Sequence, residues 1–252
     1  MFAEFLKKDD FYHLYIKRYA TKMASTNLDM EEQEANKTLH NKTVNMYENI
    51  ISFINLINKN QNITPFDLIE VANDINKNQG INKGFRKTQV EIKKASFFPI
   101  AAYMVPQAIY ALFDNYYTTW DNLDVYEKEA MFHINLVRIQ PFEDGNKRTA
   151  RIITNYNLCK QNRAPIIITK QEIDEYWQYI NNYDIEGFTK FLRKKSRQEF
   201  EEMLDLYQKN CSLSLVYDSK DDNSFLEVTN KILKDIKKLE QDEKSDYQKT
   251  YS

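Results

Sequence analysis

Residues 138–151 combine residue types that suit the binding of an anion. Pro141 and Gly145 interrupt one helical pattern there, and a new apolar periodicity begins after Asn146. The first turns of the new helix then carry three cations, Lys147, Arg148 and Arg151. The N-terminal end of a helix attracts anions through its dipole and its unpaired N–H groups, so cations clustered there favour a phosphate-bearing ligand.

The residue just before that turn is an acid. Asp144 supplies carboxylate oxygens, which suit the divalent cation that usually accompanies a polyphosphate. The segment is therefore interpreted as a polyphosphate cradle with a place for a divalent cation. An alternative is that Arg148 and Arg151 form surface ion pairs with acids such as Glu143, which contribute little to stability. Charge alone leaves both interpretations open.

The order of the residues in this segment resembles a family signature. From Gln140 to Arg151 the chain reads QPFEDGNKRTAR, which is similar to HPFxDGNGRxxR, the motif of the Fic family (Fic/Doc, or Fido). Residues 84–99 are similar to the family's segment that leads into a β-hairpin flap. Residues 133–139 are similar to the end of the helix before the motif loop.

The resemblance implies a fold and a reaction. The fold is an all-α Fic fold, a helical bundle with a small β-hairpin flap. The reaction is adenylyl (AMP) transfer from ATP to a Ser, Thr or Tyr hydroxyl of a target protein. The cofactors implied are ATP and Mg²⁺, and the partner is an unidentified protein target.

The same resemblance implies roles for single residues. Asp144 would bind the Mg²⁺ that bridges the phosphates, and Gly145 and Asn146 would donate main-chain and side-chain hydrogen bonds to them. The other phosphate-binding residues would be Lys147, Arg148 and Arg151, with Arg151 on the γ-phosphate. Phe142 would point into the core and fix the loop. The flap residues that dock the target backbone by strand addition would be Val90, Glu91 and Ile92.

Gln140 stands where the family signature has histidine. That histidine accepts the proton of the attacking hydroxyl, whereas an amide has no basic lone pair near neutral pH; losing a general base costs ~10²–10⁴-fold in rate. The resemblance implies that Gln140 and Arg151 occupy the catalytic positions. With glutamine in place of the histidine, we expect transfer to be impaired. Three explanations stay open: a natural pseudoenzyme that still binds nucleotide, an engineered inactive variant, or a different chemistry. His133, about two helical turns earlier, is interpreted as structural.

Two alternatives to AMP transfer remain. Lys147 occupies a position where AMP-transferring members often have glycine, and the Doc branch, which transfers the γ-phosphate, carries lysine there. A Doc-like phosphotransferase is thus one alternative. The other is a catalytically dead module that recognises a protein through the flap, with ATP vestigial.

An upstream segment resembles the family's inhibitory motif, Ser/Thr-x-x-x-Glu-Gly/Asn. Residues 25–30 read STNLDM, so that Asp29 replaces the glutamate and Met30 replaces the small residue. We expect Ser25 and Asp29 to form a degenerate version of this motif, with Asp29 approaching Arg151.

Composition argues against several other classes of protein. The 252 residues include 35 Lys+Arg and 37 Asp+Glu, a net charge of −2, so no bulk binding to nucleic acid or to a membrane surface is expected. Only four glycines are present, and neither a G-x-G-x-x-G turn nor a G-x-x-x-x-G-K-[ST] loop occurs. The two cysteines and three histidines lack zinc-site spacing. No signal peptide or spanning segment is seen, so a cytoplasmic location is expected, or delivery by a secretion system that needs no cleavable signal; the oligomeric state stays open.

The elements that would position the motif are mostly helices. Apolar periodicity predicts helices at about 64–76, 104–117, 123–138, 146–162 and 171–182. Thr64, Pro65 and Asp67 predict the start of the first one. Alternation within residues 89–98 predicts the hairpin. Three regions are expected: an N-terminal helical extension (1–62), a Fic core (63–195) and a charged C-terminal tail (196–252) with an amphipathic helix near 225–239.

Overall fold

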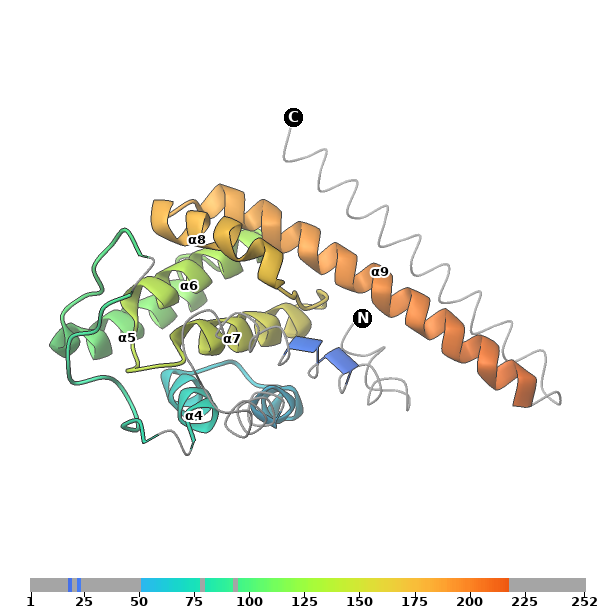
Figure 1. Ribbon diagram of the computed structural model, residues 1–252, viewed down its shortest axis with the longest axis horizontal. Helices are drawn as coiled ribbons and strands as arrows, with labels where there is room; N and C mark the ends of the chain where they lie inside the picture. The colour runs from blue at the N-terminus through green and yellow to red at the C-terminus, as the bar shows by residue number, and fades with distance from the viewer. Residues whose placement is uncertain (1–17, 20–21, 24–50, 78–79, 93–94, 218–252) are drawn as a thin grey trace. The chain divides into compact units, whose positions relative to one another are not determined.

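The computed structural model describes residues 18–19, 22–23, 51–77, 80–92 and 95–217, and it is built from helices (Figure 1). Residues 51–59 are helical. The α-helices that follow are α4 (Pro65–Ile75), α5 (Val105–Tyr117), α6 (Val125–Ile139), α7 (Asn146–Lys160), α8 (Ile173–Asn182) and α9 (Ile185–Tyr217). Two 3₁₀ turns, η1 (Ala102–Met104) and η2 (Lys170–Glu172), precede α5 and α8. The described residues contain no strand, and the predicted all-α fold is confirmed.

Helix α7 is the central element of this arrangement. It packs against α4 and α6, and α5 and α8 pack in turn against α6 (Figure 1). Every residue of α7 except Lys147 and Lys160 is buried, although its sequence is rich in polar side chains. Because buried polar groups need hydrogen-bond partners, α7 must find those partners on its neighbours.

The start of α4 follows the sequence prediction. Thr64 Oγ1 accepts a hydrogen bond from Asp67 N at 3.2 Å, and an Asp67 carboxylate oxygen accepts one from Thr64 N at 2.9 Å. This reciprocal pair is a capping box, and Pro65 occupies the first helical position. The helix therefore begins where its local residue types require, and its C-terminal end reaches the motif loop.

The predicted helices near 104–117, 123–138, 146–162 and 171–182 correspond to α5, α6, α7 and α8. The long helix α9 was not predicted, because its apolar residues are sparse among charged ones. The expected boundary at residues 195–196 falls inside α9, whereas the chain divides into the compact units Met1–Met203 and Leu204–Ser252.

The expected β-hairpin is not confirmed. Residues 89–92 and 95–98 have no strand, and their backbones form no ladder in the described part of the segment. Side chains make the connections instead: Gln89 Nε2 donates to Pro99 O at 3.0 Å, and Ser96 N donates to Asn181 Oδ1 at 2.9 Å. With the N–H of Ser96 bound to α8, it is not available to a strand partner. We keep the word flap for residues 88–100.

Other expectations lie outside the described residues. These are the inhibitory segment with Ser25 and Asp29, most of the extension before residue 51, and the amphipathic helix near 225–239. Among the described residues, no helix has both the length and the apolar character needed to cross a membrane.

Candidate functional site

The site begins where α6 ends. Gln140 closes α6 in the left-handed conformation, with φ 51°, and its N–H donates to Leu136 O at 3.3 Å. Its side chain turns back on the same helix, because Nε2 donates to Val137 O at 2.7 Å. Pro141 follows and cannot continue the helix. Only 7% of Gln140 is exposed, so its side chain is held against the helix end rather than extended into solvent.

Phe142 and Asn146 close the loop on itself. Phe142 N donates to Asn146 Oδ1 at 2.8 Å, and Asn146 Nδ2 donates to Phe142 O at 2.8 Å. The Phe142 ring is buried and lies 5.9 Å from that of Phe85, between centroids. Phe142 therefore points into the core, as expected. The Asn146 amide thus holds the loop closed, and the phosphate contact expected of it stays a prediction.

Gly145 allows α7 to start close to the end of α4. Its φ is +80°, which favours glycine, and an added Cβ would lie only 2.9–3.1 Å from atoms of Asn76 and Ile75. It occupies the N-cap of α7 and supplies no side-chain cap. The N–H groups of a first helical turn have no partner within their own helix. This turn is therefore suited to receiving an anion.

Asp144 and Arg148 form the charged part of the site. Asp144 Oδ1 accepts from Gly145 N at 2.6 Å, and Oδ2 lies 3.2 Å from an Arg148 guanidinium nitrogen. Arg148 also donates to Ile75 O and Asn76 Oδ1, both at 3.3 Å. The Asp144 side chain is 47% exposed, whereas that of Arg148 is 1% exposed. Arg148 thus supports the carboxylate from inside while the carboxylate faces outward.

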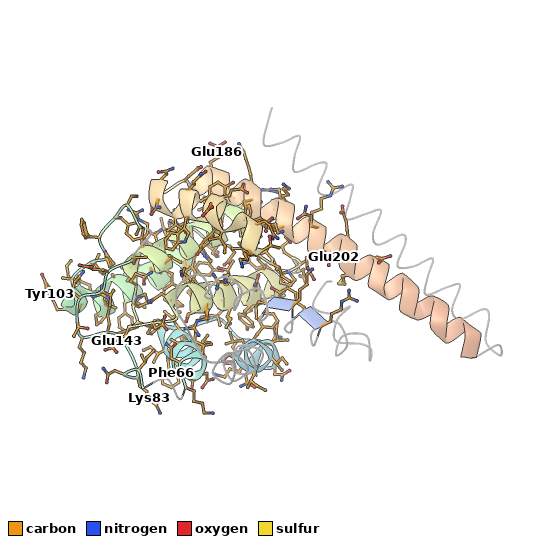
Figure 2. All side chains as sticks on the ribbon, in the orientation of Figure 1. Phe66, Lys83, Tyr103, Glu143, Glu186 and Glu202 are labelled. Atoms are coloured by element: carbon orange, nitrogen blue, oxygen red, sulfur yellow. The ribbon has the colours of Figure 1, made fainter. Side chains whose placement is uncertain are left out.

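The surface ion-pair interpretation of the two arginines is wrong. Arg148 and Arg151 are both buried. Glu143, the acid suggested for them, accepts from Asn82 Nδ2 at 2.8 Å. Figure 2 shows Glu143 and Lys83 at the lower left of the ribbon, around the helix labelled α4 in Figure 1.

Arg151 lies in a buried polar cluster with Tyr176 and His133. Arg151 hydrogen-bonds Tyr176. The two ring nitrogens of His133 lie 3.0 Å from Thr154 Oγ1 and 3.0 Å from Tyr176 Oη. Burial, and secondarily the Arg151 charge, lowers the pKa of His133 to about 3. A histidine that stays neutral and bonded inside the core fits the structural role expected for His133.

Lys147 is the one half-buried cation of the first turn of α7. Its Nζ lies over the ring of Trp177 on α8, 5.0 Å from the centroid. Trp177 had no role in the sequence analysis. The ring holds the ammonium group beside α8, next to the start of α7.

The flap contributes the remaining predicted residues. Val90 and Ile92 are half-buried and Glu91 is exposed. The flap is fixed to α8 through Ser96, and the Phe97 ring lies 4.2 Å from the guanidinium carbon of Arg138. The three predicted docking residues therefore belong to a segment that is anchored at its end nearest α5.

The structure brings the predicted loop residues together at the start of α7 but also shows partners that the sequence did not indicate. Asn76, at the end of α4, donates from Nδ2 to Asp144 O at 2.8 Å and accepts from Arg148. Arg86 donates from Nε to Gln140 O at 2.6 Å. Only the resemblance of residues 84–99 to a family segment pointed toward Arg86, and nothing in the sequence singled out Asn76.

The site has one carboxylate that could hold a metal ion. In the described ranges, no three His, Cys, Asp or Glu side chains gather as a metal site. Asp144 offers a single, half-exposed carboxylate. One carboxylate together with substrate phosphate oxygens is a usual Mg²⁺ environment, so the residues present fit a Mg²⁺–nucleotide complex.

Comparison with known proteins assigns the segment that contains this site to a family. The model of the "Fic/DOC family" matches residues 62–158, which include α4, the flap, the motif loop and most of α7. Residues 62–158 form a Fic/DOC family domain. The solved structure of a Fic domain-containing signalling protein from Bacteroides thetaiotaomicron has a TM-score of 0.67 and 16% identity, covering 80% of this chain and 92% of that one. This likeness shows the Fic fold.

Curated relatives carry an activity in their names. The protein adenylyltransferase Fic of Aedes aegypti is 30% identical over 182 residues, which cover 67% of this chain and 34% of the relative. The protein of the same name from Culex quinquefasciatus is 29% identical over 201 residues, covering 74% and 36%. The chain thus spans about a third of the length of these two relatives.

Proposed function

We propose that this Fic domain binds MgATP at the start of α7 and is built for AMP transfer to a protein hydroxyl, with the transfer step impaired by Gln140. The observation that carries the proposal is the arrangement around Gly145. A helix start whose N-cap is a glycine, a half-exposed Asp144 and the ammonium of Lys147 meet at one place. The curated relatives named protein adenylyltransferase support the reaction type.

The chain's own residues would act mainly by positioning the nucleotide. The first-turn N–H groups of α7 would bind phosphate oxygens, as helix N-termini commonly do. Lys147, whose ammonium group lies over the ring of Trp177, would add positive charge beside the phosphates. Arg151, buried and hydrogen-bonded to Tyr176, would bind the far phosphate once it enters the site. Phosphoryl-type transfer relies on such positioning and charge stabilisation.

Asp144 would hold the Mg²⁺. Arg148 and the N–H of Gly145 fix its carboxylate, and almost half of the side chain faces outward. When bound, Mg²⁺ neutralises phosphate charge and orients the phosphates.

Gln140 would align a hydroxyl without accepting its proton. Its Nε2 donates to Val137 O at 2.7 Å. In the same place the Nδ1–H of an imidazole could donate to that carbonyl. Its Nε2 would then be the deprotonated nitrogen, because the tautomer follows from the bond that the other nitrogen makes. The local geometry is thus compatible with a histidine general base.

The test compares the protein with its Gln140→His variant. Each is given Mg²⁺ and ATP labelled at the α- or the γ-phosphate, together with a cell lysate, and label on protein is measured. We expect α-label transfer to rise by roughly 10²–10⁴-fold in the variant, the range that a general base contributes. Gln140→Ala is the matched control and should give no rise.

The other outcomes identify the alternatives. Transfer of γ-label by either form would show a Doc-like phosphotransferase. If no label moves although MgATP binding is measured by calorimetry, AMP transfer is wrong for this chain. A chain that neither transfers label nor binds MgATP would be a protein-binding module with a vestigial site.

A further inference from the structure

Arg86 is a buried cation whose partners are all backbone carbonyls. The residue is 2% exposed. Its Nε donates to Gln140 O at 2.6 Å, and its terminal nitrogens donate to Thr88 O at 2.9 Å, to Ile139 O at 3.4 Å and to Ile100 O. No carboxylate among the described residues pairs with it. Its charge is therefore shared among several peptide groups.

These carbonyls belong to two different segments. Ile139 and Gln140 end α6 and open the motif loop, and the backbone N–H of Arg86 itself donates to Pro141 O at 2.8 Å. Thr88 and Ile100 are the two ends of the flap. One side chain thus joins both ends of the flap to the start of the motif loop.

The motif loop needs such support. Gln140 has φ 51°, a conformation that costs a residue other than glycine of order 1–3 kcal/mol and persists only where its surroundings hold it. Arg86 donates to the carbonyl that precedes this strained residue, that of Ile139, and to the carbonyl of Gln140 itself. These carbonyls lie at the C-terminal end of α6, where the helix dipole also favours a cation.

We propose that Arg86 is a positioning residue that fixes the flap and residue 140 relative to each other. Under the proposed function, the flap would carry the target backbone and residue 140 would face the target hydroxyl, so their separation would set whether a docked hydroxyl meets its base. That link to transfer rests on the proposed function. The mechanical coupling of the flap to the motif loop is independent of the proposed function, because it is inferred from the hydrogen bonds of Arg86 alone.

The coupling requires a guanidinium. Its planar fork offers five N–H donors in fixed directions, whereas a lysine ammonium offers three on a shorter reach and without that geometry. Arg86→Lys therefore keeps the charge but loses most of the simultaneous contacts.

Arg138 provides a matched control. Its terminal nitrogen donates to Ile180 O at 2.8 Å and to Asn181 O at 3.2 Å, and its guanidinium stacks on Phe97 of the flap. It resembles Arg86 in donating to carbonyls at a helix end and in touching the flap. Its hydrogen bonds and ring contacts with the described residues lie on α8, on Phe97 and on Tyr183, not on the motif loop.

The experiment is amide hydrogen exchange on the full chain, comparing the parent with Arg86→Lys and Arg138→Lys. In Arg86→Lys we expect exchange to quicken by roughly tenfold both in residues 88–100 and in residues 139–146, with α5 unchanged. In Arg138→Lys only the flap should quicken. If Arg86→Lys alters one of the two segments alone, or neither, the coupling proposal is wrong.

A second measurement covers the case in which Arg86→Lys does not fold. In the parent protein, exchange of the flap and of the motif loop is followed at increasing low concentrations of denaturant. A coupled pair opens as one unit, so both segments should show the same free energy of opening and the same denaturant dependence. Different values would overturn the proposal.

A third measurement separates this inference from the proposed function. In the Gln140→His background, Arg86→Lys should leave the calorimetric affinity for MgATP within about twofold while lowering α-label transfer by roughly tenfold or more, as expected for misplaced groups. Unchanged transfer in a variant with altered exchange would overturn the catalytic role of the coupling. Absence of transfer in the Gln140→His parent would count against the proposed function and leave the exchange test decisive for Arg86.

Discussion

The two ends of α7 both contain buried charged groups, but they differ in their access to solvent. At the start, Arg148 is buried while Asp144, its partner, is almost half exposed. Toward the other end, Glu129 of α6 is fully buried and accepts hydrogen bonds from Tyr116, from Asn157 at 3.1 Å and from Gln161 at 3.1 Å. The first cluster is open to a ligand and the second is closed.

The carboxyl of the closed cluster is strongly perturbed by burial. Burial raises the pKa of Glu129 to about 7, and the hydrogen bonds from Tyr116 and Asn157 only partly oppose the shift. A perturbed carboxyl is often taken as a sign of a functional site. Here every oxygen of that carboxyl is occupied by a neighbour, whereas the carboxylate of Asp144 at the open end faces outward. Access, rather than burial of charge, distinguishes the candidate site.

The largest effect is expected from a substitution at Glu129, in the closed cluster. Glu129→Ala removes the acceptor for three donors and leaves a cavity. We expect a loss of roughly 3 kcal/mol or more in the free energy of unfolding, because each buried donor left without a partner costs about 1–3 kcal/mol. Urea unfolding measures the loss. MgATP affinity of the folded variant, measured below the transition, should be unchanged; a large fall in affinity would mean that the closed cluster belongs to the site after all.

Glu129→Gln tests the closed cluster through the pH dependence of the free energy of unfolding. The folded pKa of about 7 lies above the ordinary 4.5, so folding favours the protonated form. The contribution of Glu129 to stability is thus full below pH 4.5 and is lost as pH rises toward 7, by roughly 3 kcal/mol in total. Gln cannot ionise, and Asn157 can reverse its amide to suit it. The stability of the variant relative to the parent should therefore increase between pH 4.5 and 7 and level off above; a difference that is flat with pH would show that Glu129 is ionised normally.

At the open end, Asp144→Asn should act on the ligand. The amide keeps an oxygen for Gly145 N but loses the charge that would hold Mg²⁺. We expect calorimetric affinity for MgATP to fall roughly tenfold, about 1.4 kcal/mol, because the metal would lose a charged ligand. The affinity for ATP with chelator present should change much less. Glu143→Gln is the matched control, because that neighbouring acid contacts Asn82 instead; equal losses in both variants would argue against a metal ligand at Asp144.

Local signals explain what was predictable. The capping box of Thr64 and Asp67 and the turn at Gly145 depend on residues close together in the chain, and both appear in the structure as predicted. Periodicity placed α5, α6, α7 and α8 for the same reason. The all-α fold and the meeting of the motif residues at the start of α7 followed from these elements.

Distant partners explain what was not predictable. Arg148 turns to Asn76 at the end of α4, and Ser96 gives its N–H to Asn181 of α8, which replaces the predicted hairpin contact. Asn146 uses its amide on the loop itself, although its type suited a phosphate equally well. Such choices depend on which groups the folded chain brings near, and residue type alone does not contain them.

The smallest expected effect concerns Lys147 and Trp177, which border the open end. A cation in the first turn opposes the helix dipole by about 0.3–1 kcal/mol, and a cation–π contact contributes a similar amount in the other direction. Lys147→Gln alone should therefore change stability little. A double-mutant cycle with Trp177→Leu isolates the contact and should give a coupling energy of about 0.5–1 kcal/mol by urea unfolding. A coupling near zero would mean that the ring does not hold the ammonium group. Lys147 would then be positioned by its other contacts, and the open end would depend on α7 and Asp144 alone.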